Sequence, residues 1–248
     1  MINKFALVGF SGLIVCGVCL AAAAAIGGKA LHDAHYDFGG LFDDGDHCGF
    51  DPSGQQGSRN IPWNGGDSVA IAIPAMVHYR PGAGDMVQVT IRGDTAILPH
   101  IRIEDSTLKM DCNWRTSRKS EIEVTLPGRP FRGFKIAGAG GLRLDAIDQP
   151  ELNISVAGAG DVEANGKTAR LDLDMAGAGD ARLGSLAANA VKVRMAGAND
   201  AEIAPIDDLN VKIAGLGDVK LRTEPHKIES DIAGAGHIIH PNDLDKDD

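Results

Sequence analysis

Aromatic side chains are scarce in this sequence and make up 4% of its 248 residues. Proteins that hold sugars or single-stranded nucleic acid by stacking use aromatic rings, so the usual stacking platforms are missing. A core with so few aromatics must be built from Val, Ile, Leu and Ala. Basic residues are also outnumbered, and the formal net charge of −10 argues against nucleic acid as a partner.

A catalytic constellation is missing as well. Ser, His and Asp all occur, and His226, His237 and His240 cluster late in the chain, but there is no G-x-S-x-G nucleophile motif. The outward residues of the expected strands show no obvious pair of carboxylates that could cleave a polysaccharide. We therefore expect a protein that is not an enzyme and needs no cofactor. A polysaccharide-cleaving enzyme is the less favoured alternative.

Glycine is abundant, with 32 residues, and many of these glycines lie in a repeated pentapeptide. The motif Ala-Gly-Ala-Gly-Asp starts at Ala157 and at Ala176. Variants start at residues 137, 196, 214 and 233, so that successive copies are 18 to 20 residues apart. A fixed period of this size signals a repeat architecture.

Each repeat has the pattern of a strand, a glycine corner and a second strand. Residues 171–175 alternate apolar and polar side chains before one corner, and residues 181–183 do so after it. This period of two is typical of a half-buried strand. No helical pattern separates the corners, which excludes leucine-rich, ankyrin and tetratricopeptide repeats.

The predicted fold class is therefore all-β: a single-chain parallel β-helix (β-solenoid) of about 19-residue repeats with an irregular N-terminal part. An antiparallel sandwich is the alternative, but a sandwich does not need one pentapeptide at a fixed period. Glycine suits the corner because it tolerates positive φ and allows close backbone approach. The predicted structural corner glycines are Gly158, Gly160, Gly177, Gly179, Gly197, Gly215, Gly217, Gly234 and Gly236.

Four segments are expected along the chain. Residues 1–30 form a signal peptide or an N-terminal membrane anchor. Residues 31–66 form a flexible, acidic, Gly-rich linker. Residues 67–240 form the β-helical domain, and residues 241–248 form an acidic disordered tail.

The N-terminal segment decides the compartment. Lys4 is followed by residues 5–28, which carry no charge, and Ala21 to Ala25 offer cleavage sites with small residues. Cleavage gives a secreted or periplasmic protein, whereas an uncleaved segment anchors it in the cell envelope. Either alternative places the remaining chain outside the cytoplasm, with membrane contact only through this segment if it is uncleaved.

The repeated corner is accompanied by other short motifs, at residues 63–67, at residues 73–75 and in Leu-Lys-Met-Asp-Cys at residues 108–112. Together they resemble the bacterial head GIN domain family, described as autotransporter adhesin heads, over about residues 61–239. The resemblance implies a β-helical fold and an adhesin-like role, and the family has no assigned catalytic residues. The chain departs from the family in using Ala where many members have Ser in the corner, and in Asn199 and His237.

A row of aspartates ends the corners, and two interpretations of it are open. Each carboxylate can accept backbone N–H hydrogen bonds at its corner, which is a structural role. Alternatively, the row can bind a cation, because calcium takes carboxylate and carbonyl oxygens. We favour the structural role and predict no metal site, so the row supplies only weak metal candidates: Asp161, Asp180, Asp200 and Asp218.

Cys48 and Cys112 are the only cysteines after residue 30. In an oxidising, exported compartment they are predicted to form a disulfide. The alternative leaves Cys48 free in the linker.

The functional hypothesis is an exported, non-catalytic module that binds a cell-envelope or extracellular polymer in the manner of an adhesin. The alternative is a structural or regulatory envelope protein whose partner is a surface protein. Two basic stretches with aromatics, residues 114–119 and 129–135, could grip anionic polysaccharide or lipid head groups through Arg. Such stretches are more often solvated loops.

Overall fold

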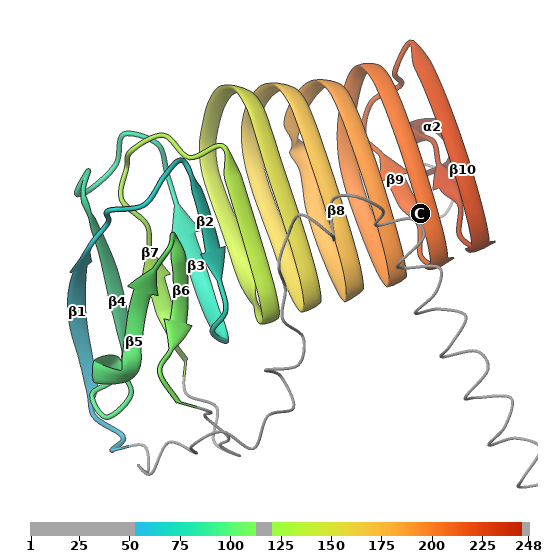
Figure 1. Cartoon of the computed structure of the whole chain (residues 1–248). Helices are drawn as coiled ribbons and strands as arrows, with labels where there is room; N and C mark the ends of the chain where they lie inside the picture. The colour runs from blue at the N-terminus through green and yellow to red at the C-terminus, as the bar shows by residue number, and fades with distance from the viewer. Residues whose placement is uncertain (1–52, 113–120, 245–248) are drawn as a thin grey trace, which may run out of the picture.

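The computed structural model describes residues 53–112 and 121–244, and its architecture is all-β (Figure 1). Eleven strands belong to one sheet, accompanied by a short 3₁₀ helix and a short α-helix. Within this part of the chain, no helix has the length and apolar character needed to cross a membrane.

The elements follow one another in chain order. They are β1 (Gln56–Pro62), β2 (Ser68–Ile71), β3 (Ala75–Tyr79), β4 (Gln88–Asp94), η2 (Leu98–His100), β5 (Ile101–Glu104), β6 (Thr107–Met110), β7 (Glu123–Thr125), β8 (Gly133–Leu216), β9 (Val219–Leu221), β10 (Lys227–Ala235), β11 (Ile238–Ile239) and α2 (Pro241–Leu244). β1 lies inside the segment predicted as a linker, so residues 56–62 are paired strand rather than tether. α2 occupies the start of the predicted disordered tail.

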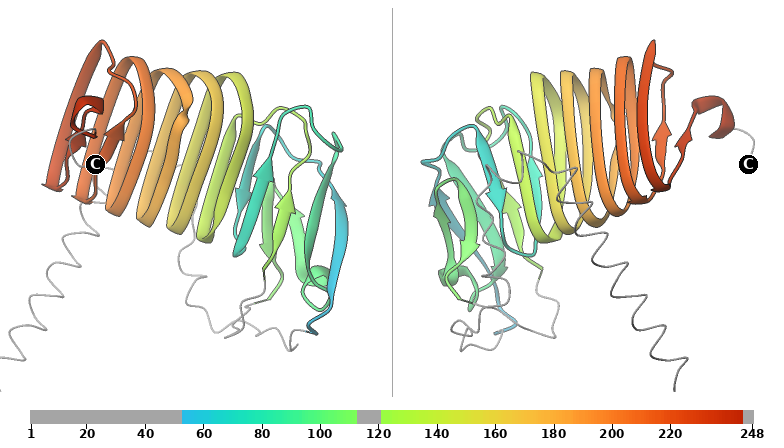
Figure 2. Two further views of the ribbon diagram at one scale, coloured as in Figure 1. Left: turned by 180° about the vertical axis from the view of Figure 1, so that it is seen from behind. Right: turned by 45° about the vertical axis from the view of Figure 1, so that its right-hand side comes forward.

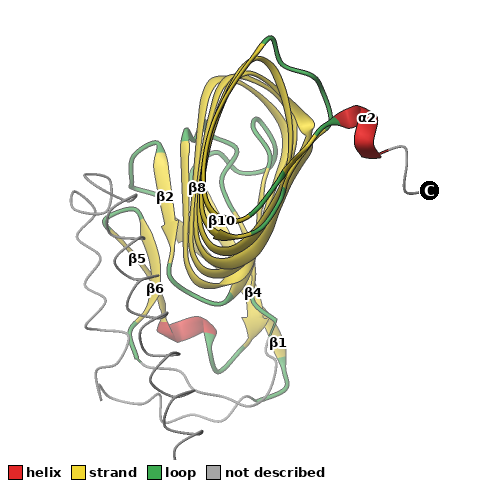
Figure 3. Cartoon of the chain, turned by 90° about the vertical axis from the view of Figure 1, so that its right-hand side faces the viewer, coloured by secondary structure: helices red, strands yellow, loops and turns green. Residues whose placement is uncertain are grey.

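Strand pairing in the sheet is mixed. β1 pairs antiparallel with β4, β4 with β7, and β5 with β6, whereas β2, β3, β9 and β10 pair parallel with β8. Viewed end-on, the wall of the molecule is a nearly closed oval (Figure 3). The prediction of a parallel β-helix is therefore wrong, although its all-β class is confirmed: the sheet is a nearly closed barrel with mixed strand pairing.

The N-terminal strands explain this error. The pentapeptide does not occur before residue 137, so its period carries no information on how the earlier strands pair. β5 and β6 are joined by Asp105 and Ser106, which have φ of 48° and 64°. A two-residue connection with positive φ at both positions folds its strands back antiparallel.

β8 carries most of the wall. Its 84 residues wind around the core in successive circuits that lie side by side in both views of Figure 2. The corner glycines of neighbouring circuits are in close backbone contact. A Cβ added to Gly177, whose φ is +128°, would lie 2.0 Å from the carbonyl oxygen of Gly158. The same contact with the preceding circuit occurs at the other corner glycines: Gly158, Gly160, Gly179, Gly197, Gly215, Gly217, Gly234 and Gly236.

The inside of the wall is filled by the apolar member of each alternating pair. Leu171, Leu173 and Met175 are buried, while Asp172 and Asp174 between them face outward. Because facing strands contribute the same kinds of residue, the core is a continuous column of aliphatic side chains.

The aromatic residues that the structure describes gather at the N-terminal end of this column. Trp63, Tyr79, Phe131 and Phe134 form edge-on or tilted pairs with ring centroids 5.1 to 6.1 Å apart. The Tyr79 hydroxyl donates to the carbonyl of Arg129 at 3.0 Å and accepts from the N–H of Phe131 at 3.2 Å. Burial raises the pKa of Tyr79 despite the hydrogen bond from Phe131.

Asp94, at the end of β4, forms hydrogen bonds with the first residues of the described chain. Its carboxylate accepts the N–H of Gly54 at 2.6 Å, the hydroxyl of Ser53 at 2.8 Å and the N–H of Ala96 at 2.8 Å. Burial raises the pKa of this carboxyl, but the hydrogen bonds from Ala96, Ser53 and Gly54 outweigh burial and hold its pKa below the ordinary value.

Replacing Gly177 by Ala should destabilise the protein strongly, because the new Cβ would overlap the Gly158 carbonyl. Gly138 is a matched control: its φ is +103°, but a Cβ there meets no atom within 4 Å. Gly138→Ala therefore costs only backbone strain, about 1–3 kcal/mol. We expect Gly177→Ala to exceed that cost by about 2 kcal/mol or more in chemical denaturation. Equal unfolding free energies for the two variants would contradict the close contact of circuits.

Replacing Asp94 by Asn should lower the stability of the fold at neutral pH. A carboxyl whose pKa is lowered by folding stabilises the protein above its unfolded pKa, about 4, and loses that contribution as the pH falls through the folded pKa. The difference between wild type and Asp94→Asn in urea-denaturation midpoint should therefore be largest near pH 7 and shrink below about pH 4. A difference that is constant from pH 7 to acid would show that the charge of Asp94 is unimportant.

Candidate binding surface

A shallow depression of about 310 Å³ lies on the outer face of the wall, across four successive circuits. Ala190 lines it, together with the buried residues Val191 and Leu209. The polar residues around it are Arg170, Asp172, Lys192, Asp208, Asn210, Lys227 and Glu229.

The depression exists because side chains on the outer face are aligned in columns. Lys227 lies opposite Asp208, and Glu229 opposite Asn210, in the parallel register of β10 and β8. Gly197 contacts Gly177, which lies 20 residues earlier, and Gly215 contacts Gly197, which lies 18 residues earlier. The same offsets place Ala190 between Arg170 and Asp208 on neighbouring circuits. A methyl group in a column of long charged side chains leaves a hollow.

The arginine beside this hollow, Arg170, differs from the other arginines of the wall. Arg143, Arg182, Arg194 and Arg222 each form an ion pair with a carboxylate: Glu163, Asp180, Asp174 and Glu202, respectively. These contacts raise the pKa of Arg143, of Arg194 and of Arg222, chiefly through the hydrogen bond to the acid.

Arg170, Lys192 and Asp208 make no side-chain hydrogen bond or ion pair with any residue that the structure describes. On the far side of the hollow the polar groups are paired with one another. The Lys227 ammonium lies 2.7 Å from Glu229, and the Asn210 amide donates to Glu229 at 3.1 Å. Asp172 has no such partner in the described chain either, so two cations and two carboxylates are available to a ligand. The sequence offered one signal for this site, an Ala at an outward position that is otherwise charged, and our sequence analysis missed it.

The corner aspartates lie on neighbouring circuits and bond to backbone. The N–H of Asp180 donates to Asp161 at 3.1 Å, that of Asp218 to Asp200 at 2.8 Å, and that of His237 to Asp218 at 3.0 Å. Asp180 also accepts from Arg182 at 2.9 Å. The carboxylates of Asp161, Asp200 and Asp218 thus link one circuit to the next, whereas that of Asp180 bonds within its own circuit. Within the described residues this row does not bring three metal-ligating atoms together.

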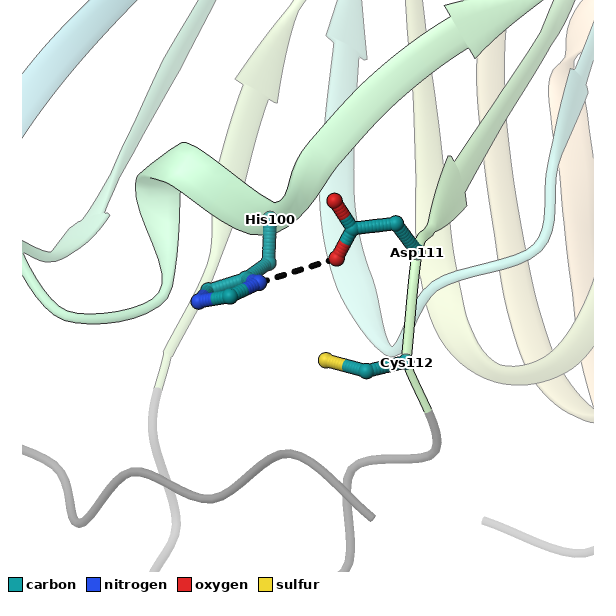
Figure 4. Close-up of side chains that lie close together, drawn as sticks. All are labelled: His100, Asp111 and Cys112. Atoms are coloured by element: carbon teal, nitrogen blue, oxygen red, sulfur yellow. Dashed lines mark hydrogen bonds and ion pairs between the residues drawn. The ribbon is translucent and has the colours of Figure 1, made fainter. Parts of the chain in front are cut away.

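One cluster in the described part of the chain has ligand atoms close enough for a metal: His100, Asp111 and Cys112 (Figure 4). His100 Nδ1 lies 2.9 Å from Asp111 Oδ1, and Arg102 donates to the other oxygen at 2.9 Å. The hydrogen bond from His100, with the contribution of Arg102, holds the pKa of Asp111 below its ordinary value. Cys112 is disulfide-bonded, so its sulfur is not the thiolate that binds metals. The cluster is better described as an ion-pair triad of His100, Asp111 and Arg102.

The other residues singled out from the sequence either lie outside the described residues or belong to the core. Cys48, the predicted partner of Cys112, and the basic stretch 114–119 lie outside the described residues. In the stretch 129–135, Phe131 and Phe134 belong to the core, and Arg129 lies over the Phe131 ring at 5.8 Å.

The late histidines do not form a common site. Each faces its own carboxylate: His226 lies 3.2 Å from Asp207, His237 3.2 Å from Asp218, and His240 3.0 Å from Glu224.

These features define a class of protein: an all-β domain whose accessible polar groups lie on its outer wall. The chain belongs to the family described as putative auto-transporter adhesin, head GIN domain, whose model matches residues 70–225. This confirms the family resemblance seen in the sequence. No curated protein matches the chain.

The chain is also similar to solved structures, and one of them shares its fold. A putative adhesin from Bacteroides fragilis is 21% identical with a TM-score of 0.61, covering 77% of this chain and 100% of that one. A putative lipid binding protein from Parabacteroides distasonis is 16% identical with a TM-score of 0.44, covering 77% and 98%. A putative adhesin from Parabacteroides merdae is also 16% identical with a TM-score of 0.44, covering 79% and 99%. The first of these shows a shared fold, and the other two are too distant to support an inference.

Calcium should leave the melting temperature of the protein nearly unchanged relative to chelator, because the corner carboxylates already accept backbone N–H groups. Asp200→Asn is an informative variant, since Asn keeps an acceptor for the Asp218 N–H but removes the charge. A calcium-dependent rise in melting temperature that disappears in Asp200→Asn would instead identify a metal site.

Proposed function

We propose that this protein is an exported, non-catalytic, adhesin-like module that binds a cell-envelope or extracellular polymer in the depression around Ala190. The observation that supports this most is Arg170, which forms no ion pair with a described residue on a wall where the other arginines are paired with acids, with the unpaired Lys192 beside it. Membership of an adhesin head family agrees with an extracellular role.

The chemistry of the depression fits a polysaccharide that carries both hydroxyl and carboxylate groups. An Arg guanidinium binds a carboxylate through two parallel hydrogen bonds, and a Lys ammonium donates to hydroxyl or carboxylate oxygens. Asp208 supplies an acceptor for sugar hydroxyls, and the small side chain of Ala190 leaves room for the face of a sugar ring. Because the depression is open and shallow, it suits an internal unit of a long polymer.

An acidic protein repels polyanions at long range, so selectivity should favour sparsely charged polymers. The chain has a formal net charge of −10, and Asp172 and Asp208 flank the two free cations. Like charges repel unless each carboxylate of the ligand meets a cation directly. A polymer with isolated uronic acids is therefore a better candidate than a densely sulfated one.

The test is binding of the full chain to a panel of neutral, uronic-acid and sulfated glycans, followed by calorimetry on the best ligand. Arg170→Ala and Lys192→Ala should each weaken binding about ten- to a hundredfold, because a hydrogen bond to a charged group contributes about 1.5–3 kcal/mol. Ala190→Arg should block binding by filling the hollow.

Lys220→Ala is the matched control, since Lys220 is exposed on β9 and does not line the depression. It should bind like wild type. Equal affinities for Lys192→Ala and Lys220→Ala would reject the site, and the absence of glycan binding together with capture of one protein would favour the alternative function, an envelope protein with a protein partner. That alternative has support of its own in the exposed edge of β10.

A further inference from the structure

The two ends of the barrel differ. At the N-terminal end, β2 and β3 are covered by further strands, since β2 pairs with β6 and β3 with β7, and the aromatic cluster fills the core. At the C-terminal end, β10 pairs with β8 and with no other described strand (Figure 1). Half of the backbone N–H and C=O groups of β10 therefore point away from the sheet.

The inner face of β10 is also uncovered. Its inward residues Ile228, Ser230 and Ile232 lie opposite Leu209, Val211 and Ile213, which are buried at 2%, 1% and 2% exposure. Ile232 is itself 38% exposed, and Ile228 is half-buried. In the end-on view, α2 lies beside the oval opening rather than over it (Figure 3). The aliphatic column thus reaches the surface at this end.

We propose that β10 binds β10 of a second copy of this chain, antiparallel about a two-fold axis, so that two barrels join through their C-terminal ends. An unpaired strand with a partly exposed apolar face is a template for pairing with another strand. A two-fold contact uses the same surface on both copies, so it occupies the free edge of β10 in each of them.

A second copy can offer only one matching surface. Its N-terminal end presents β1 and β5 at the edges of antiparallel pairs, with the core closed by Trp63 and Phe131. Head-to-tail stacking would therefore place the open aliphatic column of one copy against a closed end. Joining two C-terminal ends places the inner face of β10, which carries Ile228 and Ile232, beside the same face of the other copy.

The charges on the outer face select one register. The corner begins at Ala233, and Gly234 has a φ of +143°, so the straight part of β10 is residues 227–232. Directly opposite residues share a face, so inward residues must meet inward residues. With Glu229 on the two-fold axis, Lys227 of each copy lies opposite Asp231 of the other. A shift that centres Ser230 instead places Glu229 opposite Asp231 twice, which is repulsive. A shift that centres Ile228 places Lys227 opposite Glu229 but pairs only residues 227–229 of the straight part. Strand length together with charge therefore selects the register with Glu229 on the axis.

This register contains one unfavourable contact, Glu229 against Glu229 on the axis. Each of these carboxylates lies 2.7 Å from its own Lys227, which reduces the repulsion. Removing the charge of Glu229 should therefore lower the dissociation constant of the dimer. Lys227 and Glu229 also close the far wall of the proposed glycan site, so dimerisation is measured without ligand, and its failure would leave the roles of Arg170 and Lys192 standing.

The experiment is sedimentation velocity of the full chain from low micromolar to submillimolar concentration. We expect a concentration-dependent dimer. Lys227→Glu and Asp231→Lys should each raise the dimer dissociation constant about tenfold or more, because each change turns two attractive pairs into repulsive ones. The double variant should return toward wild type, and Glu229→Gln should lower the dissociation constant.

Lys220→Glu is the matched control, because it makes the same charge change on β9 and should leave the dimer unchanged. Circular dichroism and melting curves show that each variant is folded. A monomer at all concentrations, open-ended oligomers, a double variant weaker than both single variants, or an effect of Lys220→Glu equal to that of Lys227→Glu would overturn the proposal.

Discussion

The contact on which the rest of this structure depends is backbone against backbone at the glycine corners. At Gly177 the neighbouring carbonyl lies where a side chain would begin, and the same is true at the other corner glycines of β8 and β10. Only glycine lets two circuits approach this closely with positive φ. Because each corner lies over the previous one, the residues between corners are aligned as well, and inward positions meet inward positions along the whole wall.

This alignment turns a linear sequence into columns of outward side chains. Where a column places opposite charges on neighbouring circuits, they pair, as Arg194 does with Asp174 and Arg222 with Glu202. Where it places a small residue between long ones, as at Ala190, the surface is hollow and the nearby cations stay free. A rigid wall that holds such groups at fixed spacing can bind a repeating polymer without an enclosed pocket.

The two ends of the barrel differ in what covers their last strands. Antiparallel strands and the aromatic cluster close the N-terminal end, so the four aromatic residues of this cluster serve packing. Asp94 fixes the entry of the chain there through hydrogen bonds to Ser53 and Gly54. The C-terminal end has no such cover among the described elements, which leaves its edge available for association.

The sequence by itself determined the family, the all-β class and the corner positions, because a period of about 19 residues and strict apolar alternation are local signals that survive in any strand arrangement. Strand direction depends instead on which distant segments meet, so the antiparallel pairing of β1, β4, β5 and β7 and the closure of the barrel came only from the tertiary structure. The same holds for the hollow at Ala190 and for the triad of His100, Asp111 and Arg102. The residues of the hollow lie one repeat apart, so the period aligns them, but the hollow itself depends on how the circuits pack. The residues of the triad lie outside the repeat, and only the packing of the hairpin brings them together.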